Sequence, residues 1–399
     1  MADEPPGSAR TTTLLLAFAS FFSGAALRIC DSLIPRLAHD FDRTPGVAGQ
    51  VIISFSVAYG LMQLMFGPLG DRYGKARLVC IALFGCAAGS MASAFAPSFD
   101  VLVLTRVLWG MAAAGVIPLA IAWIGDTVAY EHRQATLARL MTGTLSGMMA
   151  GQFAGGLFAD SAAGWRGAFL SLAVGFALVG TLLAVRLRTM PAAPRLATRL
   201  PLAFVAQLKS VVKVPWARIV LVAVLAEGIF LLGPMAYLPS YLHQRYGLSL
   251  TAASALLAFY AVGGLVYAVS AKQIVRRLGE RRMVLCGGII MGIGLVGWLV
   301  SPFWALAGPL ALLVGFGSYL MHNTLQTHAT QMVPEVRGTS VAVFAFFLFG
   351  GQAIGVTSAG YAFDHWGPVP MLLVPAIAIT WVGWWFARAL ERRSSATAT

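Results

Sequence analysis

Long apolar runs alternate with short polar connections along the whole chain. Each run holds about 20 or more residues, the length that an α-helix needs to cross the hydrocarbon core of a bilayer. The runs are continuously apolar, whereas strands of a membrane barrel would alternate over about ten residues. The pattern therefore predicts an all-α membrane protein. Its twelve transmembrane helices are expected near residues 12–35, 47–69, 77–96, 99–124, 135–160, 166–187, 217–242, 249–271, 282–301, 303–331, 338–362 and 368–390.

The longest polar connection follows the sixth apolar run and is rich in proline and arginine. Apolar residues recur in it at near-helical spacing, with lysines between them. Such a pattern predicts an amphipathic helix on the membrane surface, formed by Leu202, Phe204, Val205, Leu208, Lys209, Val211, Val212 and Lys213. We therefore expect an N-terminal six-helix bundle over residues 1–187, a linker over 188–216 and a C-terminal six-helix bundle over 217–399.

The two predicted bundles resemble each other at an offset of 204 or 205 residues. The matching pairs are Pro35 with Pro239, Arg72-Tyr73-Gly74 with Arg277-Leu278-Gly279, and Glu131-His132-Arg133 with Glu335-Val336-Arg337. Matches at one offset in equivalent loops indicate a duplicated unit, which makes the bundles pseudo-symmetric. Repeated halves are typical of secondary transporters, whose substrate binds near the midplane between them.

Composition agrees with a lipid environment. The chain is 58% hydrophobic and 11% charged, whereas soluble domains carry about 25% charged residues. Its net charge of +13 does not indicate nucleic-acid binding, because the basic residues lie between apolar runs rather than on one face. The cysteines have no metal-ligand spacing and are interpreted as small buried hydrophobic residues; they are Cys30, Cys80, Cys86 and Cys286.

The distribution of basic residues predicts the orientation. If both termini lie on one side, 22 of the 28 lysines and arginines fall on that side, 4 fall on the other, and Arg28 and Arg106 lie within spans. Cytoplasmic loops of membrane proteins carry the excess of lysine and arginine. We therefore expect a multi-pass protein of a bacterial inner (plasma) membrane with both termini in the cytoplasm.

The connection between the second and third runs, from Gly67 to Arg77, carries glycines, an acid and several cations. The glycines allow two helix ends to approach closely. Asp71 can accept hydrogen bonds at a helix N-terminus and pair with a cation such as Arg133. The pattern predicts a latch that holds one conformation, although a plain positive-inside turn would also suit it. The predicted latch residues are Gly67, Asp71, Arg72, Gly74, Arg77, Asp126 and Arg133.

Four charged residues lie inside apolar runs, where an ionisable group is costly and is a functional candidate by default. Arg28 and Asp31 are three residues apart and share one helix face. Proton coupling is therefore assigned to Asp31, Arg106, Glu227 and Arg28, with Asp31 first as the proton carrier. The alternative is that Arg28 and Asp31 only neutralise each other and that Glu227 is a hydrogen-bonded structural acid.

Further polar and aromatic residues in the runs suit a cavity lining. His322 and Gln326 are four residues apart and share a helix face. The predicted substrate cavity consists of Tyr59, Gln152, Tyr237, Tyr260, His322 and Gln326, although such aromatics also serve in packing or in the interfacial belt. Small residues four apart permit close helix packing, and this role is expected of Gly147, Gly151, Gly155 and Gly156.

Three of these segments resemble motifs of the major facilitator superfamily. The run from Gly67 to Arg77 resembles its cytoplasmic loop signature, and the segment around Arg106 is similar to its fourth-helix motif, whose arginine is tied to proton coupling. The segment from Gly147 to Gly156 resembles the motif associated with antiporters, with Gln152 where proline is usual. The resemblance covers the whole chain and implies the twelve-helix fold of drug:proton antiporters.

No nucleotide-binding loop and no hydrolytic or zinc arrangement occurs in the sequence. We therefore expect no enzyme activity and no cofactor, with a proton gradient as the energy source and a monomer as the working form. The predicted function is proton-coupled efflux of small hydrophobic or amphipathic compounds. The alternatives are a symporter that imports a small organic anion, a lipid flippase and a non-transporting sensor.

Overall fold

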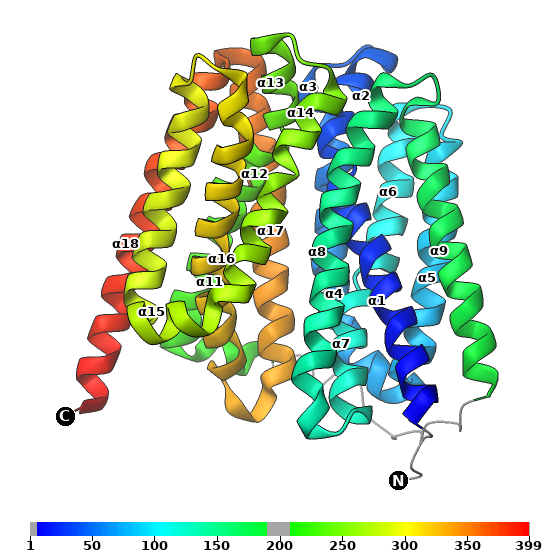
Figure 1. Ribbon diagram of the computed structural model, residues 1–399, viewed down its shortest axis with the longest axis vertical. Helices are drawn as coiled ribbons and strands as arrows, with labels where there is room; N and C mark the ends of the chain where they lie inside the picture. The colour runs from blue at the N-terminus through cyan, green and yellow to red at the C-terminus, as the bar shows by residue number, and fades with distance from the viewer. Residues whose placement is uncertain (1–5, 190–207, 399) are drawn as a thin grey trace.

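The computed structural model describes residues 6–189 and 208–398, which form helices and connecting turns and contain no strand (Figure 1). Leu202, Phe204 and Val205 of the predicted amphipathic linker helix lie outside the described part of the chain. Residues 208–213, its last predicted turns, are helical.

The N-terminal half consists of α1 (Pro6–Arg28), η1 (Asp31–Leu33), α2 (Ile34–Asp40), α3 (Pro45–Ala48), α4 (Gln50–Tyr73), α5 (Lys75–Ala94), α6 (Phe99–Ala113), α7 (Val116–Thr127), α8 (Tyr130–Asp160) and α9 (Gly164–Arg188). The C-terminal half consists of α11 (Pro215–Glu227), η2 (Gly228–Leu232), α12 (Gly233–Met235), α13 (Leu238–Tyr246), α14 (Leu250–Leu257), α15 (Phe259–Val300), η3 (Trp304–Leu306), α16 (Ala307–Gln331), η4 (Pro334–Val336), α17 (Arg337–Trp366) and α18 (Pro368–Ala398).

The described residues account for the twelve predicted crossings. Ten helical segments are long and apolar enough to span a membrane, and one of them, Leu250–Val300, contains two predicted spans. The remaining crossing is α8, which is more polar than the others but covers the predicted span at 135–160 and runs beside α1 for most of its length (Figure 1).

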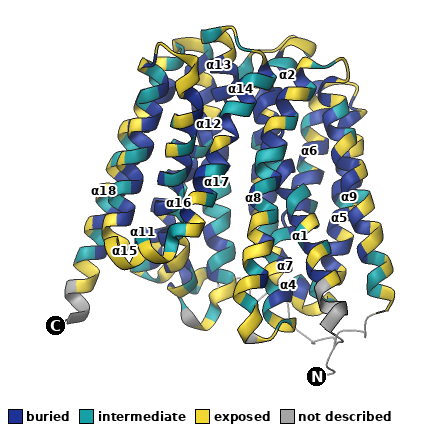
Figure 2. Cartoon of the chain, viewed as in Figure 1, coloured by how far each residue is buried: buried dark blue, intermediate teal, exposed yellow. Residues whose placement is uncertain are grey.

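The two halves stand side by side, and both chain termini lie at the same end of the molecule (Figure 1). Across the boundary, α4 packs against α17 and α8 packs against α14. Figure 2 shows buried residues concentrated between the helices. Large apolar side chains are exposed on the outer faces, including Val269 at 91% and Ile377 at 64%. Such faces suit contact with lipid tails rather than with water.

Two helices break at equivalent places in the two halves. The first crossing is interrupted between α1 and α2 by the short 3₁₀ turn η1, and the seventh by the π-turn η2 after Glu227. Pro35 and Pro239 then lie in the first turns of α2 and α13, where a missing N–H is tolerated. Discontinuous helices at corresponding positions are typical of transporter binding sites.

The predicted repeat is also visible in the backbone. Gly74 follows α4 with φ of 88°, and Gly279, its match at an offset of 205 residues, interrupts α15 with φ of 68°. This left-handed region is readily accessible to glycine. The two glycines therefore make equivalent turns at corresponding points of the two halves.

Candidate functional site

A cavity of about 200 Å³ lies between the halves and draws its walls from both. The helix breaks described above supply part of it, because Arg28 ends α1 and Glu227 ends α11. The remaining walls are mostly apolar and aromatic. The lining residues are Leu27, Arg28, Met148, Glu227, Leu232, Tyr260, Ser318, Tyr319, His322, Leu348, Phe349 and Gln352.

Glu227 and His322 form a polar pair in the wall of this cavity. The Glu227 carboxylate and His322 Nδ1 are 2.9 Å apart, and the Glu227 side chain is only 2% exposed. The ring of Phe344 lies beside the imidazole at 5.6 Å. A carboxylate shielded from water in this way needs a hydrogen-bonding or cationic partner.

Arg28 connects the cavity to Asp31. Its Nη1 donates to Asp31 Oδ2 at 2.9 Å, and its guanidinium lies 5.5 Å from the ring centre of Tyr260. Asp31 is completely buried and lies behind Arg28 rather than in the cavity wall. Its Oδ1 atom has no hydrogen-bond partner in the described part of the chain. Asp31 is therefore linked to the cavity through Arg28.

Arg106 is buried in an aromatic enclosure in the N-terminal half. Its Nε donates to the Val51 carbonyl at 3.1 Å, and its guanidinium lies 4.2 Å from the Phe55 ring centre and 4.6 Å from that of Trp109. Its charge acts on Asp31, although no hydrogen bond links the two side chains in the described residues. Among described residues, Arg106 Nη1 also lacks a hydrogen-bond partner.

The halves are joined at the end opposite to the termini, which we call the gate end. Asp160 at the end of α8 accepts hydrogen bonds from the backbone N–H groups of Leu250 (3.2 Å) and Thr251 (2.7 Å), at the start of α14. Asp364 near the end of α17 accepts from Gly46 N at 3.0 Å, at the start of α3. A carboxylate at a helix N-terminus is favourable because it meets unpaired N–H groups and the positive end of the dipole.

These two clamps are related by the internal repeat. Asp160 and Asp364 are 204 residues apart, as are Gly46 and Leu250. Each half thus caps a helix of the other half. The two acids therefore have the same reciprocal role, one from each half.

Two predicted cavity residues lie at the gate end instead. The Tyr237 hydroxyl donates to the Val356 carbonyl at 3.0 Å, and Gln152 Nε2 donates to Ser32 Oγ at 2.8 Å. Ser32 Oγ also receives a hydrogen bond from Ser254 of the other half at 2.7 Å. Their polar atoms are therefore used to hold helices together, which is why they do not line the cavity.

The other predicted cavity residues divide in a similar way. Tyr260 and His322 line the cavity. Tyr59 stands behind it, with its ring 4.5 Å from that of Phe349. Gln326 lies one turn further along α16 and is exposed outside the cavity wall.

The predicted latch loop forms a charge cluster within the N-terminal half. Lys75 Nζ lies 2.9 Å from Asp71 and 2.5 Å from Asp126, so one cation joins the end of α4 to the end of α7. The sequence suggested Arg133 as the partner of Asp71, whereas Arg133 Nε donates to the Val128 carbonyl at 2.8 Å. Gly74 makes the turn described above. Gly67 has open space around its Cα, and Arg72 and Arg77 are exposed.

The glycines of α8 form a contact stripe against α1. A Cβ atom on Gly147 or Gly151 would meet the carbonyl oxygen of Phe21 or Ala25, respectively, closer than atoms can approach. Gly155 meets the Ile29 carbonyl in the same way, and Gly156 faces α14 in the other half. The stripe therefore permits the backbones of α1 and α8 to touch, next to the break that carries Arg28 and Asp31.

Sequence reasoning missed the neutral members of the site. Ser318 donates to or accepts from Tyr260 at 2.8 Å and lies four residues before His322, a spacing that could have revealed it. Met148 and Gln352 line the cavity without a comparable signal. Lys75 was also missed, although its spacing of four residues from Asp71 on a helical turn is typical of an ion pair.

Comparison with known proteins gives a consistent picture. The model of the family described as "Major Facilitator Superfamily" matches residues 16–356. The "Probable transporter SCO4007" of Streptomyces coelicolor is 27% identical over 383 residues, covering 91% of this chain and 84% of the relative. The "Multidrug export protein EmrB" of Haemophilus influenzae is 29% identical over 168 residues, covering 42% of this chain and 33% of that protein.

A solved structure shares the fold. The crystal structure of the peptide transporter POT in complex with sulfate superimposes with a TM-score of 0.79 at 13% identity, covering 96% of this chain and 94% of the other. At this level of identity the similarity concerns the fold alone.

Proposed function

The chain belongs to the Major Facilitator Superfamily, and the relatives named above are transporters rather than enzymes. On this basis we propose that it exports small amphipathic compounds in exchange for protons. The observation that carries the proposal is the connection from cavity to buried acid: Arg28 faces the cavity and is held by Asp31 behind it. The partial similarity to a multidrug export protein supports the efflux direction.

The charge balance around the cavity supports a cationic amphipathic substrate. With Asp31 ionised, Arg28 is neutralised, and Glu227 leaves the cavity with a negative charge when His322 is neutral. The aromatic and aliphatic lining would receive the apolar part of the substrate. A cation can also be attracted to the faces of Tyr260, Tyr319 and Phe349.

Protonation of Asp31 would couple the transport of the proton to that of the substrate. A proton on Asp31 removes the counter-charge of Arg28, so the cavity becomes more positive and its affinity for a cation falls. Loss of the proton reverses this change. Proton and substrate would then occupy the transporter in turn without competing for the same atom. Glu227, with His322, is the second group at which a proton could replace the cationic substrate.

Alternating access would use the contacts at the two ends. In this conformation the clamps of Asp160 and Asp364 join the halves at the gate end. We propose that this end faces outward and that both termini lie in the cytoplasm of a bacterial cell, as the lysine and arginine distribution predicts. The cavity would then load from the cytoplasm, and release would require both clamps to open.

The proposal is tested with everted membrane vesicles that have an acid interior and a pH-sensitive dye. Cationic amphipathic compounds are added to vesicles that contain the wild type, Asp31→Asn, or the exposed-acid control Asp100→Asn. We expect some compounds to dissipate the gradient with the wild type and with Asp100→Asn but not with Asp31→Asn. If Asp31→Asn dissipates the gradient equally well, the proton-carrying role of Asp31 is wrong.

One observation favours a second candidate function. Arg28 places a guanidinium in the cavity wall, and a small organic anion could bind there in a symporter. The direction of flux separates the candidates, because a symporter would move a labelled anion together with protons into right-side-out vesicles. An exporter would instead move a cationic compound in the direction opposite to that of the protons.

A further inference from the structure

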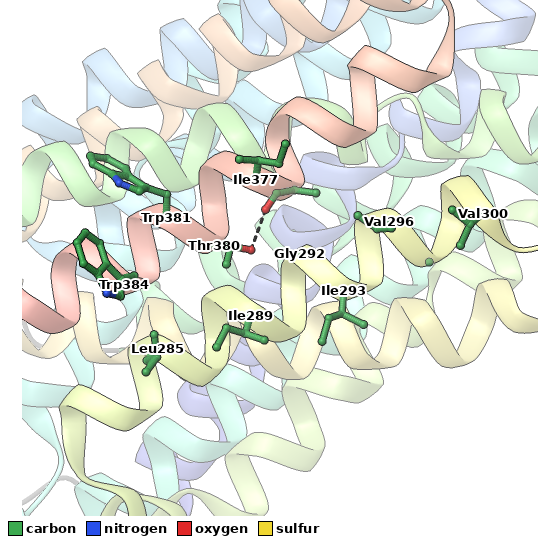
Figure 3. A pocket seen from close by; sticks show the side chains of 12 residues that line it. Leu285, Ile289, Gly292, Ile293, Val296, Val300, Ile377, Thr380, Trp381 and Trp384 are labelled. Atoms are coloured by element: carbon green, nitrogen blue, oxygen red, sulfur yellow. Dashed lines mark hydrogen bonds between the residues drawn. The ribbon is translucent and has the colours of Figure 1, made fainter.

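A second hollow lies on the outer face of the C-terminal half, between α15 and α18 (Figure 3). It has a volume of about 830 Å³ and lies away from the central cavity. Its walls carry large exposed apolar side chains, including Ile293 (59%), Ile377 (64%) and Trp381 (56%). We call it the α15/α18 groove.

Apart from the indole N–H groups of Trp381 and Trp384, the described lining residues of the groove offer no free polar side chain. Thr380 is the one hydroxyl residue among the described lining residues, and its Oγ1 lies 2.8 Å from the Ala376 carbonyl (Figure 3). The Gly288 carbonyl lies 3.3 Å from the same oxygen. An occupant that needs several hydrogen bonds would find few partners there. An alkyl chain would lose nothing on entering and would gain contacts along the walls.

The depth of the groove suits a chain of one membrane leaflet. The α15 side runs from Leu285 to Val300, which is about 22 Å at 1.5 Å per residue. The hydrocarbon core of a bilayer is about 30 Å thick, so one leaflet occupies roughly half of that. The groove is therefore longer than one leaflet is deep, and an acyl chain that enters from one surface would meet apolar walls through the whole of that leaflet.

The groove ends at a basic rim near the termini. Trp384 closes the lining at this end, and the Arg388 guanidinium lies 5.4 Å from its ring centre. Arg282 precedes Leu285 by three residues and is exposed, as is Arg388. Glu391, the acid at this rim, pairs with Arg281 at 2.8 Å, which also holds the two helices in register.

We propose that the α15/α18 groove binds an anionic phospholipid, with one acyl chain in the groove and the phosphate between Arg282 and Arg388. The apolar wall gives way to the cationic rim at the membrane surface, where the acyl chains of a lipid join its phosphate group. Basic pockets between membrane helices at the cytoplasmic surface suit anionic head groups. A second copy of the chain fits less well, because a two-fold axis along the membrane normal would bring the same arginines of both copies to the same depth.

The test uses purified full-length protein, native mass spectrometry, and dioleoyl phosphatidylglycerol or dioleoyl phosphatidylethanolamine as the probe. The wild type is expected to retain phosphatidylglycerol at least tenfold more tightly than phosphatidylethanolamine. The Arg282→Gln/Arg388→Gln variant is expected to bind phosphatidylglycerol about tenfold or more weakly and so to lose this preference, because each arginine near the surface contributes to anionic lipid binding. Arg139→Gln, the same change at an exposed position of the other half, is expected to leave it intact.

A second variant tests the groove itself. Ile293→Trp fills the groove from a lipid-facing position and is expected to weaken the binding of both lipids. The proposal is overturned if the double arginine variant keeps the wild-type preference, if Arg139→Gln removes it equally, or if Ile293→Trp leaves both lipids bound as before. A dimer in the native spectra that Ile293→Trp abolishes would assign the groove to a second copy of the chain and would also overturn it.

Discussion

Two buried carboxylates near the cavity differ in how far their surroundings neutralise them. Asp31 has a guanidinium at 2.9 Å and the charge of Arg106 nearby, whereas Glu227 has an imidazole at 2.9 Å. A buried ion pair needs both partners, because removing one leaves a charge that the interior does not solvate. The Arg28–Asp31 pair is therefore a structural requirement as well as a candidate coupling element.

The pair predicts a characteristic pattern of stability. Arg28→Met should lower the free energy of unfolding by about 3–5 kcal/mol, because it leaves Asp31 buried without its cation. Arg28→Met/Asp31→Asn should recover most of that loss. Unfolding in detergent micelles measures both variants, with Arg281→Met as the control for an exposed pair worth about 1 kcal/mol or less. A double variant as unstable as Arg28→Met would show that the two side chains are not energetically coupled.

Glu227 should control the binding of cations. Glu227→Gln is expected to weaken the binding of a cationic amphipathic compound by about tenfold or more, since interactions with charged groups contribute about 1.5–3 kcal/mol. Titration calorimetry measures the affinity, with Glu131→Gln as the exposed control. An equal loss of affinity for a neutral compound of the same size would indicate that the substitution changes the shape of the cavity instead.

At the scale of elements, the site depends on interrupted helices packed at close range. The breaks after Arg28 and Glu227 place charged side chains in the middle of the bundle. The glycines of α8 then bring its backbone against α1 beside the first break. A change in the spacing of α1 and α8 would therefore move Arg28 and Asp31 together.

The glycine stripe can be tested with a matched pair of alanine substitutions. Gly151→Ala is expected to destabilise the protein by about 1–3 kcal/mol, because the new Cβ would collide with the backbone of Ala25. Gly350→Ala places the same methyl group in α17, where nothing lies within 4 Å, and should leave stability unchanged or raise it by up to about 1 kcal/mol. Thermal unfolding in detergent compares the two. Equal effects would contradict the tight contact between α1 and α8.

At the scale of the whole molecule, the two clamps at the gate end hold one conformation. Each capping carboxylate contributes about 1 kcal/mol, so Asp160→Ala/Asp364→Ala should raise the population that is open at this end by roughly tenfold or more. Spin labels at Val47→Cys and Trp366→Cys, on opposite sides of the gate, report the opening as a longer distance. The same labels with Asp100→Ala provide the control. An unchanged distance distribution in the double variant would exclude the clamps as the gate.

The number of crossings, the division into halves and the repeat could be predicted from the sequence because the bilayer imposes a length on each helix. The offset of the repeat even placed equivalent turns at Gly74 and Gly279. The cavity lining could not be predicted with the same success. A polar residue within an apolar run has the same local signature whether it faces a cavity or bonds to a neighbouring helix. Gln152 and Tyr237 bond at the gate end, and only the packing of distant segments decides this.

The central claim, that substrate export is driven by protons through Asp31, is tested most directly with purified protein in liposomes that are acid inside. Substrate and luminal pH are followed together with no substrate gradient imposed. The account predicts that the wild type accumulates a cationic amphipathic compound while the lumen becomes alkaline in a fixed ratio. Asp31→Asn should only equilibrate the compound and should move no protons. Accumulation by Asp31→Asn, or wild-type transport that is indifferent to the pH gradient, would contradict the account.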